Sequence, residues 1–294
     1  MHVDETGTDK ALVHHLLAAQ FPHWSHLPLS AVPSSGTDHA LYRLGEDRVV
    51  RLPRIHWAVG QAELERTWLP RLAPLLPLAV PEQLAVGEPG EGYPWPWAVY
   101  RWLKGENAVD SPHADTIETA VALAQFIRAL QAADATGGPA ADTESGGRGA
   151  PLAARDAATR RAIAESRGLI DADAVNIAWE AALRAPVYDD SPVWIHGDLE
   201  PGNLLVRDGR LSAVIDFCCL CLGDPACDLI PAWSVFTDEA RAAFRTALAV
   251  DDAAWERGKG WALSTAIIAL PYYKDTNPVL ANGARRKIEA ILNP

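Results

Sequence analysis

The sequence predicts an α+β fold, in which a small antiparallel β-sheet precedes a larger, mainly helical region. Short β-type runs separated by turns lie between residues 39 and 103. Beyond them, apolar residues recur at helical spacing, most clearly over 113–133. A further β-hairpin, expected over 203–217, interrupts the helical region. We therefore expect two domains, comprising residues 1–102 and 103–294.

The individual elements follow from hydrophobic periodicity and turn residues. Apolar positions three and four residues apart predict helices, whereas short alternating runs bounded by Gly, Pro, Asn or Asp predict strands. In order, the expected elements are helix 8–20, strands 39–44 and 48–52, helix 60–73 kinked or ended by Pro70, strands 82–87 and 96–103, helices 113–133, 151–167 and 171–185, strands 203–206 and 211–217, and helices 238–249, 253–270 and 282–292. The stretch 134–150, rich in Gly, Ala and small polar residues, is expected to be a mobile loop.

Composition and charge restrict the class of protein. The 294 residues can bury a full core, and 49% hydrophobic and 22% charged residues are ordinary for a globular protein. Apolar runs are short, and the first 20 residues lack a basic start followed by an apolar run, so we expect a cytoplasmic protein with no membrane partner. The net charge of −12 disfavours a nucleic-acid partner, which needs clustered Lys and Arg, and suits a cationic ligand.

The cysteines form one group in the sequence. They stand at Cys218, Cys219, Cys221 and Cys227. This close spacing cannot link distant parts of a secreted fold by disulfides. A zinc site would need paired C-x-x-C units or histidines beyond His196, which the segment lacks. We therefore expect reduced, largely buried thiols.

Three polar side chains are expected to meet around the predicted hairpin. It places Asn203 at its start and Asp216 near its end, while Asp198 stands on the loop that enters it. An amide oxygen and a carboxylate are hard ligands of the kind that Mg²⁺ prefers. A second carboxylate could accept the proton of an attacking hydroxyl. Phosphoryl transfer needs this alignment and charge neutralisation and little covalent chemistry from the protein.

The same segment carries a family resemblance. The string His196-Gly197-Asp198-Leu199-Glu200-Pro201-Gly202-Asn203 resembles the H-x-D-x-x-x-x-N catalytic loop of protein kinases and aminoglycoside phosphotransferases. The pattern HGDLxPGNLL is similar to the antibiotic-kinase branch, and Val214-Ile215-Asp216-Phe217 resembles the metal-binding segment that follows. The resemblance implies a two-lobed protein-kinase-like fold. Its N-lobe would be a small antiparallel β-sheet with one main helix, and its larger, mainly helical C-lobe would carry the catalytic hairpin.

The resemblance also implies site roles. Asp198 would be the catalytic residue, and Asn203 and Asp216 would hold Mg²⁺; their spacings of five and thirteen residues match the family. Two positions depart from it. Cys218 stands where Gly is usual, which puts the local backbone geometry in question, and Glu200 replaces His or Gln, which would bias the pocket toward cations.

Three further residues are expected to support the loop. His196 would organise it, and Asp224, before a proline, would cap a helix. Asp228 is expected to be a buried carboxylate that accepts hydrogen bonds from backbone donors of the loop, with a third metal ligand as the alternative.

The first domain is expected to bind the nucleotide, ATP or GTP. No lysine occurs between residues 11 and 103, so Arg51 is predicted to replace the usual strand lysine at the phosphates, the alternative being an exposed strand arginine. Glu65 is expected to orient it, with Glu63 as the fallback. The phosphate-binding loop is predicted at Ser34, Ser35, Gly36 and Thr37. The hinge that binds the base is predicted at Val99, Tyr100, Arg101 and Trp102.

The acceptor is expected to be a small, hydroxylated, cationic molecule that contacts Asp198, Glu200 and Trp233. An aminoglycoside is the leading hypothesis, because acids near the motif would suit a polyamine sugar. The alternative is a macrolide kinase, or a kinase of a hydroxylated metabolite such as a sugar, choline or homoserine. A catalytically inactive nucleotide-binding module is the second alternative. The sequence gives no indication of oligomeric state.

Overall fold

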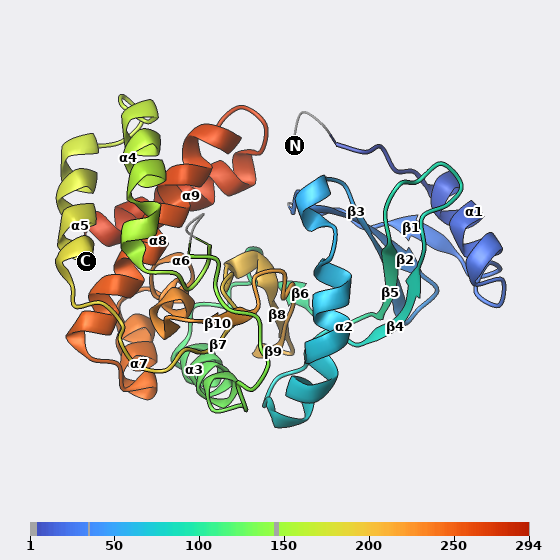
Figure 1. The fold of residues 1–294 in the computed structure, drawn as a ribbon, viewed down its shortest axis with the longest axis horizontal. Coiled ribbons are helices and arrows are strands. Elements are labelled where there is room, and N and C mark those ends of the chain that lie inside the picture. The colour runs from blue at the N-terminus through green and yellow to red at the C-terminus, as the bar shows by residue number, and fades with distance from the viewer. Residues whose placement is uncertain (1–4, 35, 144–146, 294) are drawn as a thin grey trace. The chain divides into compact units, whose positions relative to one another are not determined.

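The computed structural model describes residues 5–34, 36–143 and 147–293 (Figure 1). They form two compact units. Unit 1 contains the described residues of Met1–Pro74, Ala79–Lys104 and Val214–Cys218, and unit 2 contains those of Leu75–Leu78, Gly105–Ala213 and Cys219–Pro294. The predicted α+β class is confirmed, because unit 1 is built on an antiparallel sheet and unit 2 is mainly helical.

The sheet of unit 1 has the strand order β1-β2-β3-β5-β4, and its neighbouring strands pair antiparallel. Its strands are β1 (Leu29–Ala31), β2 (His39–Leu44), β3 (Arg48–Pro53), β4 (Gln83–Gly87) and β5 (Trp97–Arg101). β2 and β3 pair as the expected hairpin, with His39 opposite Pro53 and Leu44 opposite Arg48. β1 was not predicted, since three residues are too few to show a period of two.

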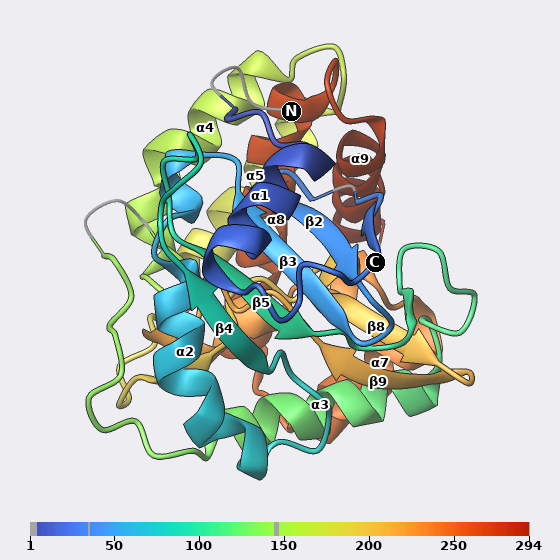
Figure 2. The same ribbon diagram turned by 90° about the vertical axis from the view of Figure 1, so that its right-hand side faces the viewer.

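Helix α1 (Lys10–Gln20) covers one face of this sheet (Figure 2). Asp9 caps its start by accepting a hydrogen bond from the backbone N–H of Leu12 at 2.8 Å. The helix buries Val13, Leu16 and Leu17, which join a hydrophobic cluster with the inward residues of β2, β3 and β5. Burial of this apolar stripe, which recurs at helical spacing, is the main force that holds α1 on the sheet.

Helix α2 (Gln61–Leu72) supplies the acidic residue of the candidate site. It begins after Gly60, whose φ of 97° lies in the left-handed region that favours glycine. Pro70 lies inside the helix, which continues to Leu72 rather than ending at the proline. The buried positions are Glu65, Leu69 and Leu72, so the glutamate lies on the same face as the apolar residues.

Unit 2 combines helices with short strand pairs. Its helices are α3 (Ile117–Gln131), α4 (Asp156–Glu165), α5 (Ala172–Arg184), α6 (Pro231–Ser234), α7 (Asp238–Leu248), α8 (Asp252–Tyr273) and α9 (Pro278–Leu292). Its strands are β6 (Glu106–Asn107), β7 (Val193–Ile195), β8 (Leu204–Arg207), β9 (Arg210–Val214, whose last residue belongs to unit 1) and β10 (Cys221–Gly223). Its short 3₁₀ segments are Leu152–Arg155, Pro201–Asn203 and Pro225–Leu229; two others are His56–Ala58 in unit 1 and Ala73–Leu75, whose last residue belongs to unit 2.

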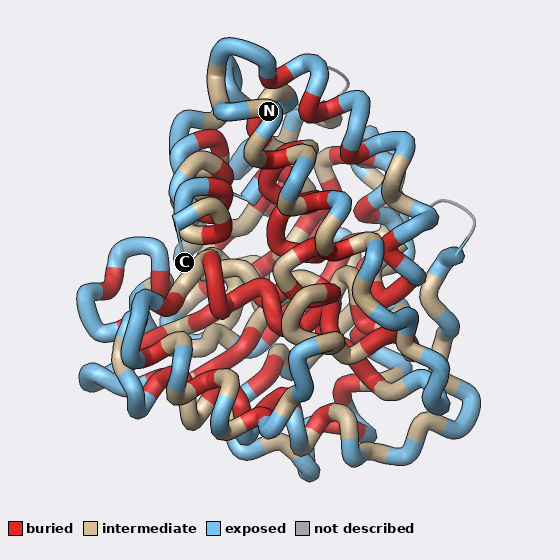
Figure 3. Tube along the Cα trace, turned by 90° about the vertical axis from the view of Figure 1, so that its left-hand side faces the viewer, coloured by how far each residue is buried: buried red, intermediate tan, exposed pale blue. Residues whose placement is uncertain are grey.

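The core of unit 2 forms around α8. Trp261, Leu263, Ile267 and Leu270 of this helix are fully buried. Figure 3 shows how buried and exposed positions alternate along the surrounding helices, as expected for amphipathic helices that pack on a common core. In the part of the chain that the structure describes, no helix combines the length and apolar composition of a membrane span.

The predicted hairpin in unit 2 is confirmed as β8 and β9, which are neighbours in the order β6-β8-β9. Its turn residues Asp208 and Gly209 both have positive φ, of 51° and 74°, as a two-residue turn of type I′ requires. β9 ends at Val214, three residues before the expected end. The reason is that Asp216 adopts a φ of 63°, which a regular strand cannot contain.

Candidate active site

The loop that carries Asp198 begins where β7 ends in unit 2. Gly197 has a φ of 79°, and a Cβ at this position would lie 2.8 Å from the carbonyl oxygen of Cys219. Only glycine fits both the conformation and the space. The chain then turns through the 3₁₀ segment Pro201–Asn203 into β8. The Gly of the motif is therefore a geometric requirement of the loop.

Asp228 holds the backbone of this loop by hydrogen bonds. It is fully buried, and its two carboxylate oxygens accept hydrogen bonds from the backbone N–H groups of His196 and Gly197, both at 2.8 Å. This is the type of contact expected from the sequence. Because each oxygen already has a backbone donor, the alternative of a third metal ligand is not supported. His196 is also fully buried, and its Nδ1 accepts a hydrogen bond from the backbone N–H of Asp198 at 3.2 Å.

Asp228 should make stability depend on pH. Burial raises the pKa of Asp228 from 3.8 to about 7, although the backbone N–H groups of Gly197 and His196 oppose the shift. Because the folded pKa lies above the unfolded one, the stabilising contribution is complete below about pH 4 and is lost as the pH rises through about 7. Asp228→Asn does not titrate. The difference in unfolding free energy between wild type and this variant, measured by chemical denaturation, should therefore shrink as the pH rises across this window. A difference that grows would mean that the pKa is lowered instead.

Asp198 and Asn203 are in direct contact. The side-chain Nδ2 of Asn203 donates to the backbone carbonyl of Asp198 at 2.8 Å and to its carboxylate Oδ2 at 2.9 Å. Both N–H groups of the amide are thereby directed at Asp198, which leaves the amide oxygen as the group that can face a cation. The structure thus brings together two of the three residues singled out in the sequence, within unit 2.

Arg148 is a site residue that the sequence analysis missed. Its Nη2 donates to Oδ1 of Asp198 at 2.9 Å. It comes from the stretch 134–150, of which residues 144–146 lie outside the described part. The expectation of a mobile loop is wrong for residues 147–150, because Ala150 is fully buried and the carbonyl of Gly149 accepts from the backbone of Asp224 at 2.9 Å. The sequence feature that could have pointed to Arg148 is its place between glycines in GGRGA, because glycine allows another backbone to approach closely.

Asp224 caps a helical turn and holds a buried cation. Its side chain accepts from the backbone N–H of Ala226 at 2.9 Å, as expected for a residue before proline. Its carboxylate also forms a two-point ion pair with Arg257 of α8, at 2.8 and 3.2 Å. Arg257 in turn donates to the carbonyl of Pro186 at 2.8 Å. The pair therefore ties the segment after β10 to the centre of unit 2.

Two residues that were predicted to contact the substrate, Glu200 and Trp233, interact with other side chains of the protein. Glu200 forms an ion pair with Lys287 of α9, and this lysine is 5% exposed. The negative charge of Glu200 is therefore countered by the chain itself, which weakens the argument that it attracts a cationic substrate. Trp233 is 4% exposed and packs against Trp255 with ring centroids 4.8 Å apart. Both positions were inferred from their place in the sequence, which carries no information on such partners.

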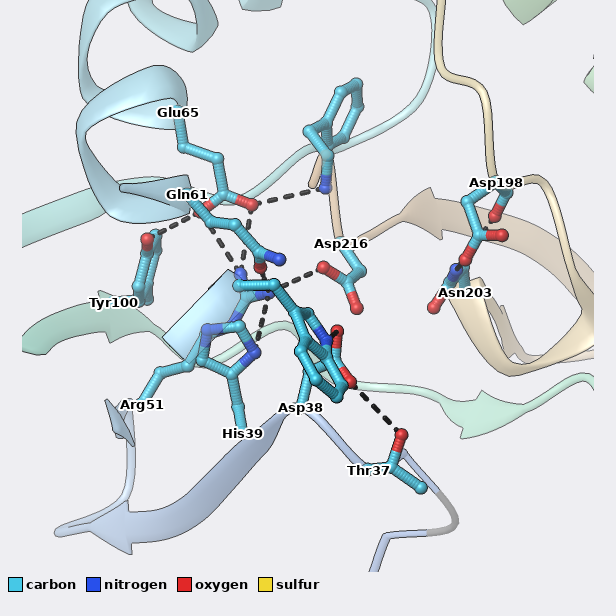
Figure 4. Close-up of polar contacts among 12 residues, drawn as sticks. Thr37, Asp38, His39, Arg51, Gln61, Glu65, Tyr100, Asp198, Asn203 and Asp216 are labelled. Carbon is cyan, nitrogen blue, oxygen red and sulfur yellow. Dashed lines mark hydrogen bonds and ion pairs between the residues drawn. The ribbon is translucent and has the colours of Figure 1, made fainter. Parts of the chain in front are cut away.

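Arg51 of β3 is the centre of a polar network in unit 1 (Figure 4). Its Nη1 donates to the two carboxylate oxygens of Glu65 at 2.9 and 3.2 Å, and its Nη2 donates to Oδ1 of Asp216 at 2.5 Å. Nη2 also lies 3.2 Å from Oε1 of Gln61 and 3.3 Å from Nδ1 of His39. Arg51 is 12% exposed, so it is not an exposed strand arginine.

Glu65 is tied to three elements of unit 1. Besides Arg51, it accepts hydrogen bonds from the hydroxyl of Tyr100 at 2.5 Å and from the backbone N–H of Phe217 at 3.2 Å. Glu63, the fallback, is exposed and pairs with Arg66 on the surface of α2. Glu65 is therefore the carboxylate that holds Arg51, and Tyr100 contributes its hydroxyl rather than a backbone group.

The charges around Arg51 set the protonation of their neighbours. Burial and the positive charge of Arg51 lower the pKa of His39 well below its usual value, so this imidazole is neutral at neutral pH. Because a guanidinium only donates, Nδ1 of His39 accepts and its proton resides on Nε2. Burial alone would lower the pKa of Arg51, but Asp216 and Glu65 raise it. The arginine is therefore a permanent cation between two carboxylates.

The segment around Asp216 accommodates the unusual Cys218. Among the described residues, the positive φ of this segment is at Asp216, with 63°, and Cys218 is absent from the positions with positive φ. The backbone at residue 218 therefore accommodates a cysteine in place of the glycine that the resemblance implied. Asp and Asn are among the non-glycine residues that adopt the left-handed region most readily. The departure from the family motif thus brings no backbone strain at residue 218.

The residues of the predicted phosphate loop and hinge make hydrogen bonds or are buried within unit 1. Ser35 lies outside the described residues. Around it, the hydroxyl of Ser34 accepts from the backbone N–H of Gly36 at 3.0 Å, and Thr37 donates to Asp38 at 3.2 Å. In the hinge, Val99 and Tyr100 are buried in the sheet. The backbone N–H groups of Arg101 and Trp102 donate to the carbonyls of Glu82 and Asp47, at 2.9 and 2.8 Å.

Each of the two expected metal ligands, Asn203 in unit 2 and Asp216 in unit 1, is an oxygen donor of the kind that Mg²⁺ takes. Asn203 offers its amide oxygen, and the carboxylate of Asp216 is 35% exposed. Mg²⁺ typically takes one or two protein oxygen ligands and completes its shell with water and phosphate oxygens. In the described ranges, no group of three or more His, Cys, Asp or Glu gathers as a metal site.

The cysteines act as weak donors around the loop. All four are free thiols; Cys227 is buried, and the other three are partly buried. The Sγ of Cys221 donates to the carbonyl of Arg148 at 3.3 Å, and that of Cys227 to the carbonyl of Gly197 at 3.8 Å. Burial raises the pKa of Cys221 to about 12 and that of Cys227 well above its usual value. Both thiols therefore remain protonated and able to donate.

The comparison with known families agrees with this geometry. Residues 31–261, more than half of the chain, match the model of the phosphotransferase enzyme family, APH. The chain belongs to the APH family. The resemblance of the catalytic-loop motif is thereby confirmed. No curated protein matches this APH-family sequence.

Solved phosphotransferases share the fold of this APH-family member. The GDP complex of wild-type aminoglycoside 2'-phosphotransferase-IIIa matches with a TM-score of 0.77 and 19% identity, over 97% of this chain and 99% of that chain. A complex of APH(2")-IIia with GDP and kanamycin matches with a TM-score of 0.76 and 19% identity, over 96% and 98%. The apoenzyme of macrolide 2'-phosphotransferase MphH from Brachybacterium faecium matches with a TM-score of 0.60 and 24% identity, over 97% and 99%. These likenesses confirm the two-lobed protein-kinase-like fold.

Proposed function

We propose that this protein transfers the γ-phosphate of a magnesium-bound nucleotide, ATP or GTP, to a hydroxyl group of a small molecule. The observation that carries the proposal is the fixed carboxylate of Asp198, hydrogen-bonded to Asn203 on a loop that Asp228 holds by its backbone. Such a site orients a hydroxyl without covalent chemistry of its own, which is what phosphoryl transfer requires. Membership of the phosphotransferase family supports the same reaction.

The roles follow from the donors present. Asp198 orients the acceptor hydroxyl and takes up its proton as the oxygen bonds to the γ-phosphorus, while the nucleoside diphosphate leaves with the electron pair of the broken P–O bond. Arg51, held by Glu65, contacts phosphate oxygens. Asn203 and Asp216 are the side chains that would hold a magnesium ion, which would supply neutralisation of the phosphate charge. In this proposal residues 1–102 carry the nucleotide site, and residues 103–294 carry the catalytic loop and the substrate pocket.

Two classes of antibiotic are the first acceptors to consider. An aminoglycoside remains the leading proposal, supported by the structural likeness to aminoglycoside phosphotransferases, one of them in complex with kanamycin. A macrolide is the second, supported by the likeness to a macrolide kinase. The acids near the motif attract a polyamine less than the sequence suggested, because Glu200 is paired with Lys287 and Asp198 with Arg148.

A panel assay tests this proposal. The purified protein should transfer labelled phosphate from ATP or GTP, with Mg²⁺, to at least one member of a panel of aminoglycosides, macrolides, sugars, choline and homoserine. Mass spectrometry of the product should show the addition of one phosphate. Removal of Mg²⁺ by a chelator should stop transfer, and addition of excess Mg²⁺ should restore it. If the protein binds nucleotide but phosphorylates no hydroxyl in any class, the inactive nucleotide-binding module becomes the better description.

A further inference from the structure

Arg148 and Asn203 hold the two oxygens of Asp198 separately. Arg148 donates to Oδ1 at 2.9 Å, and Asn203 donates to Oδ2 at 2.9 Å. The torsion that turns an aspartate carboxylate about its own stem is broad, so one anchor leaves the group free to rotate. Two donors on opposite oxygens fix the plane. The carboxylate still has lone pairs for an acceptor hydroxyl, since an ionised carboxylate offers about four acceptor sites.

The backbone around Arg148 is hydrogen-bonded to β10 and to the residue that follows this strand. Next to it, the carbonyl of Gly149 accepts from the backbone N–H of Asp224 at 2.9 Å, and the carbonyl of Arg148 accepts from the thiol of Cys221 at 3.3 Å. Gly149 has a φ of 77°, and a Cβ there would lie 2.6 Å from a side-chain carbon of Ile195. The arginine is therefore presented to Asp198 by a close backbone contact that only glycine allows.

The side chain is not explained by packing alone. Its Nη1 is buried and, within the described part of the chain, has no hydrogen-bond partner. A buried donor without an acceptor destabilises the fold, because it has lost its hydrogen bonds to water. An arginine retained only for stability would be expected to satisfy this group. The contact that Arg148 does make is with the carboxylate at the centre of the proposed reaction.

The charge of Arg148 is permanent in this position. Burial alone would lower its pKa, but the carboxylate of Asp198 raises it above its usual value. The neighbouring Arg155 responds in the opposite direction: burial and the charge of Arg148 lower the pKa of Arg155 to about 10. Arg148 therefore remains a cation and keeps its ability to donate a charge-assisted hydrogen bond to Asp198.

We propose that Arg148 is a positioning residue for phosphoryl transfer, acting through Asp198. It fixes the orientation of the catalytic carboxylate, and so affects turnover rather than nucleotide binding. This inference rests on the proposed function. Arg148 is not part of the catalytic-loop motif, because it lies 50 positions before Asp198 in the sequence.

Arg148→Ala separates this role from a structural one. We expect kcat for phosphoryl transfer to fall by about tenfold or more, because a small misplacement of a reacting group is costly, while the KM for nucleotide stays close to that of wild type. Arg148→Lys keeps a charge and should retain a larger share of kcat. Guanidinium chloride at low, non-denaturing concentration should partly restore kcat of Arg148→Ala, relative to the same concentration of sodium chloride. Arg161→Ala, at an exposed position on α4, is the matched control.

The outcomes distinguish this inference from the proposed function. If wild type phosphorylates no acceptor, the proposed function fails and the inference with it. If wild type is active but Arg148→Ala has the same kcat as Arg161→Ala, the inference alone is overturned. It is also overturned if kcat and nucleotide binding fall together without rescue by lysine or guanidinium. Should Arg148→Ala not fold, Arg148→Gln, which keeps N–H donors without the charge, takes its place in the same comparison.

Discussion

Asp198→Ala should abolish phosphoryl transfer while the protein still binds nucleotide. Asp198 is held by Asn203 and Arg148 in unit 2, on a loop anchored by Asp228, so its loss removes the group that orients the acceptor. We expect kcat to fall by about 10²–10⁴-fold, the range typical of a general base. Steady-state kinetics gives kcat, and calorimetric titration with nucleotide and Mg²⁺ gives the dissociation constant.

The comparison variants for Asp198 are Asp216→Ala and Asp173→Ala. Asp216 is the proposed metal ligand beside Arg51, so its replacement should weaken the binding of the magnesium nucleotide itself. Asp173 is an exposed acid in the first turn of α5 and should leave both kinetics and binding unchanged. If Asp198→Ala loses nucleotide binding as severely as Asp216→Ala, the role assigned to Asp198 is wrong.

Arg51→Ala should reduce both stability and nucleotide binding. Glu65 is fully buried, and removal of Arg51 leaves this carboxylate without the cation that compensates it. Breaking one side of such a pair costs about 3–5 kcal/mol of unfolding free energy. The KM for nucleotide should rise, because the same guanidinium is the proposed phosphate contact. Chemical denaturation and steady-state kinetics measure the two effects.

A surface pair of the same residue types provides the control for Arg51. Arg66 and Glu63 lie 2.7 Å apart on α2, with 59% and 60% of their side chains exposed. Arg66→Ala should leave the free energy of unfolding close to that of wild type, as expected when an exposed ion pair is removed. Arg51→Lys, which keeps the charge but not the fork, should fall between wild type and Arg51→Ala. An unchanged KM for nucleotide in Arg51→Ala would move the cationic role to Arg54 or Arg43.

The parts of the site that could be predicted from the sequence depend on residues that lie close together in the chain. The spacing of Asp198 and Asn203 along one loop required no knowledge of the rest of the chain, and the two side chains are in contact. The Asp208-Gly209 turn and the alternation around it predicted the hairpin, since a two-residue turn leaves the strands little choice of register. Glu65 followed from helical phase, because it shares the buried face of α2 with Leu69.

The contacts that were missed join positions far apart in the sequence. Arg148 meets Asp198 across 50 positions, and Lys287 meets Glu200 across 87. Each arginine or lysine alone looks like a solvated surface charge, because a charged residue is usually exposed unless it is paired. Trp233 was predicted as a substrate contact from its closeness to the motif in the sequence; in the structure it is 4% exposed and packs against Trp255.

By itself, the sequence determined the α+β class and the catalytic-loop motif, because periodicity, turns and short motifs act over a few neighbouring residues. The kinase-like fold was implied by the resemblance of that motif to a known family. Only the tertiary structure decided which charges compensate one another: Arg51 with Glu65, Arg148 with Asp198, and Lys287 with Glu200. It also assigned Val214–Cys218 to unit 1, although this segment follows the catalytic loop of unit 2 in the chain. The reason is physical. A buried charge must find an opposite charge or a polar partner, and the fold, rather than the order of residues, determines which one is within reach.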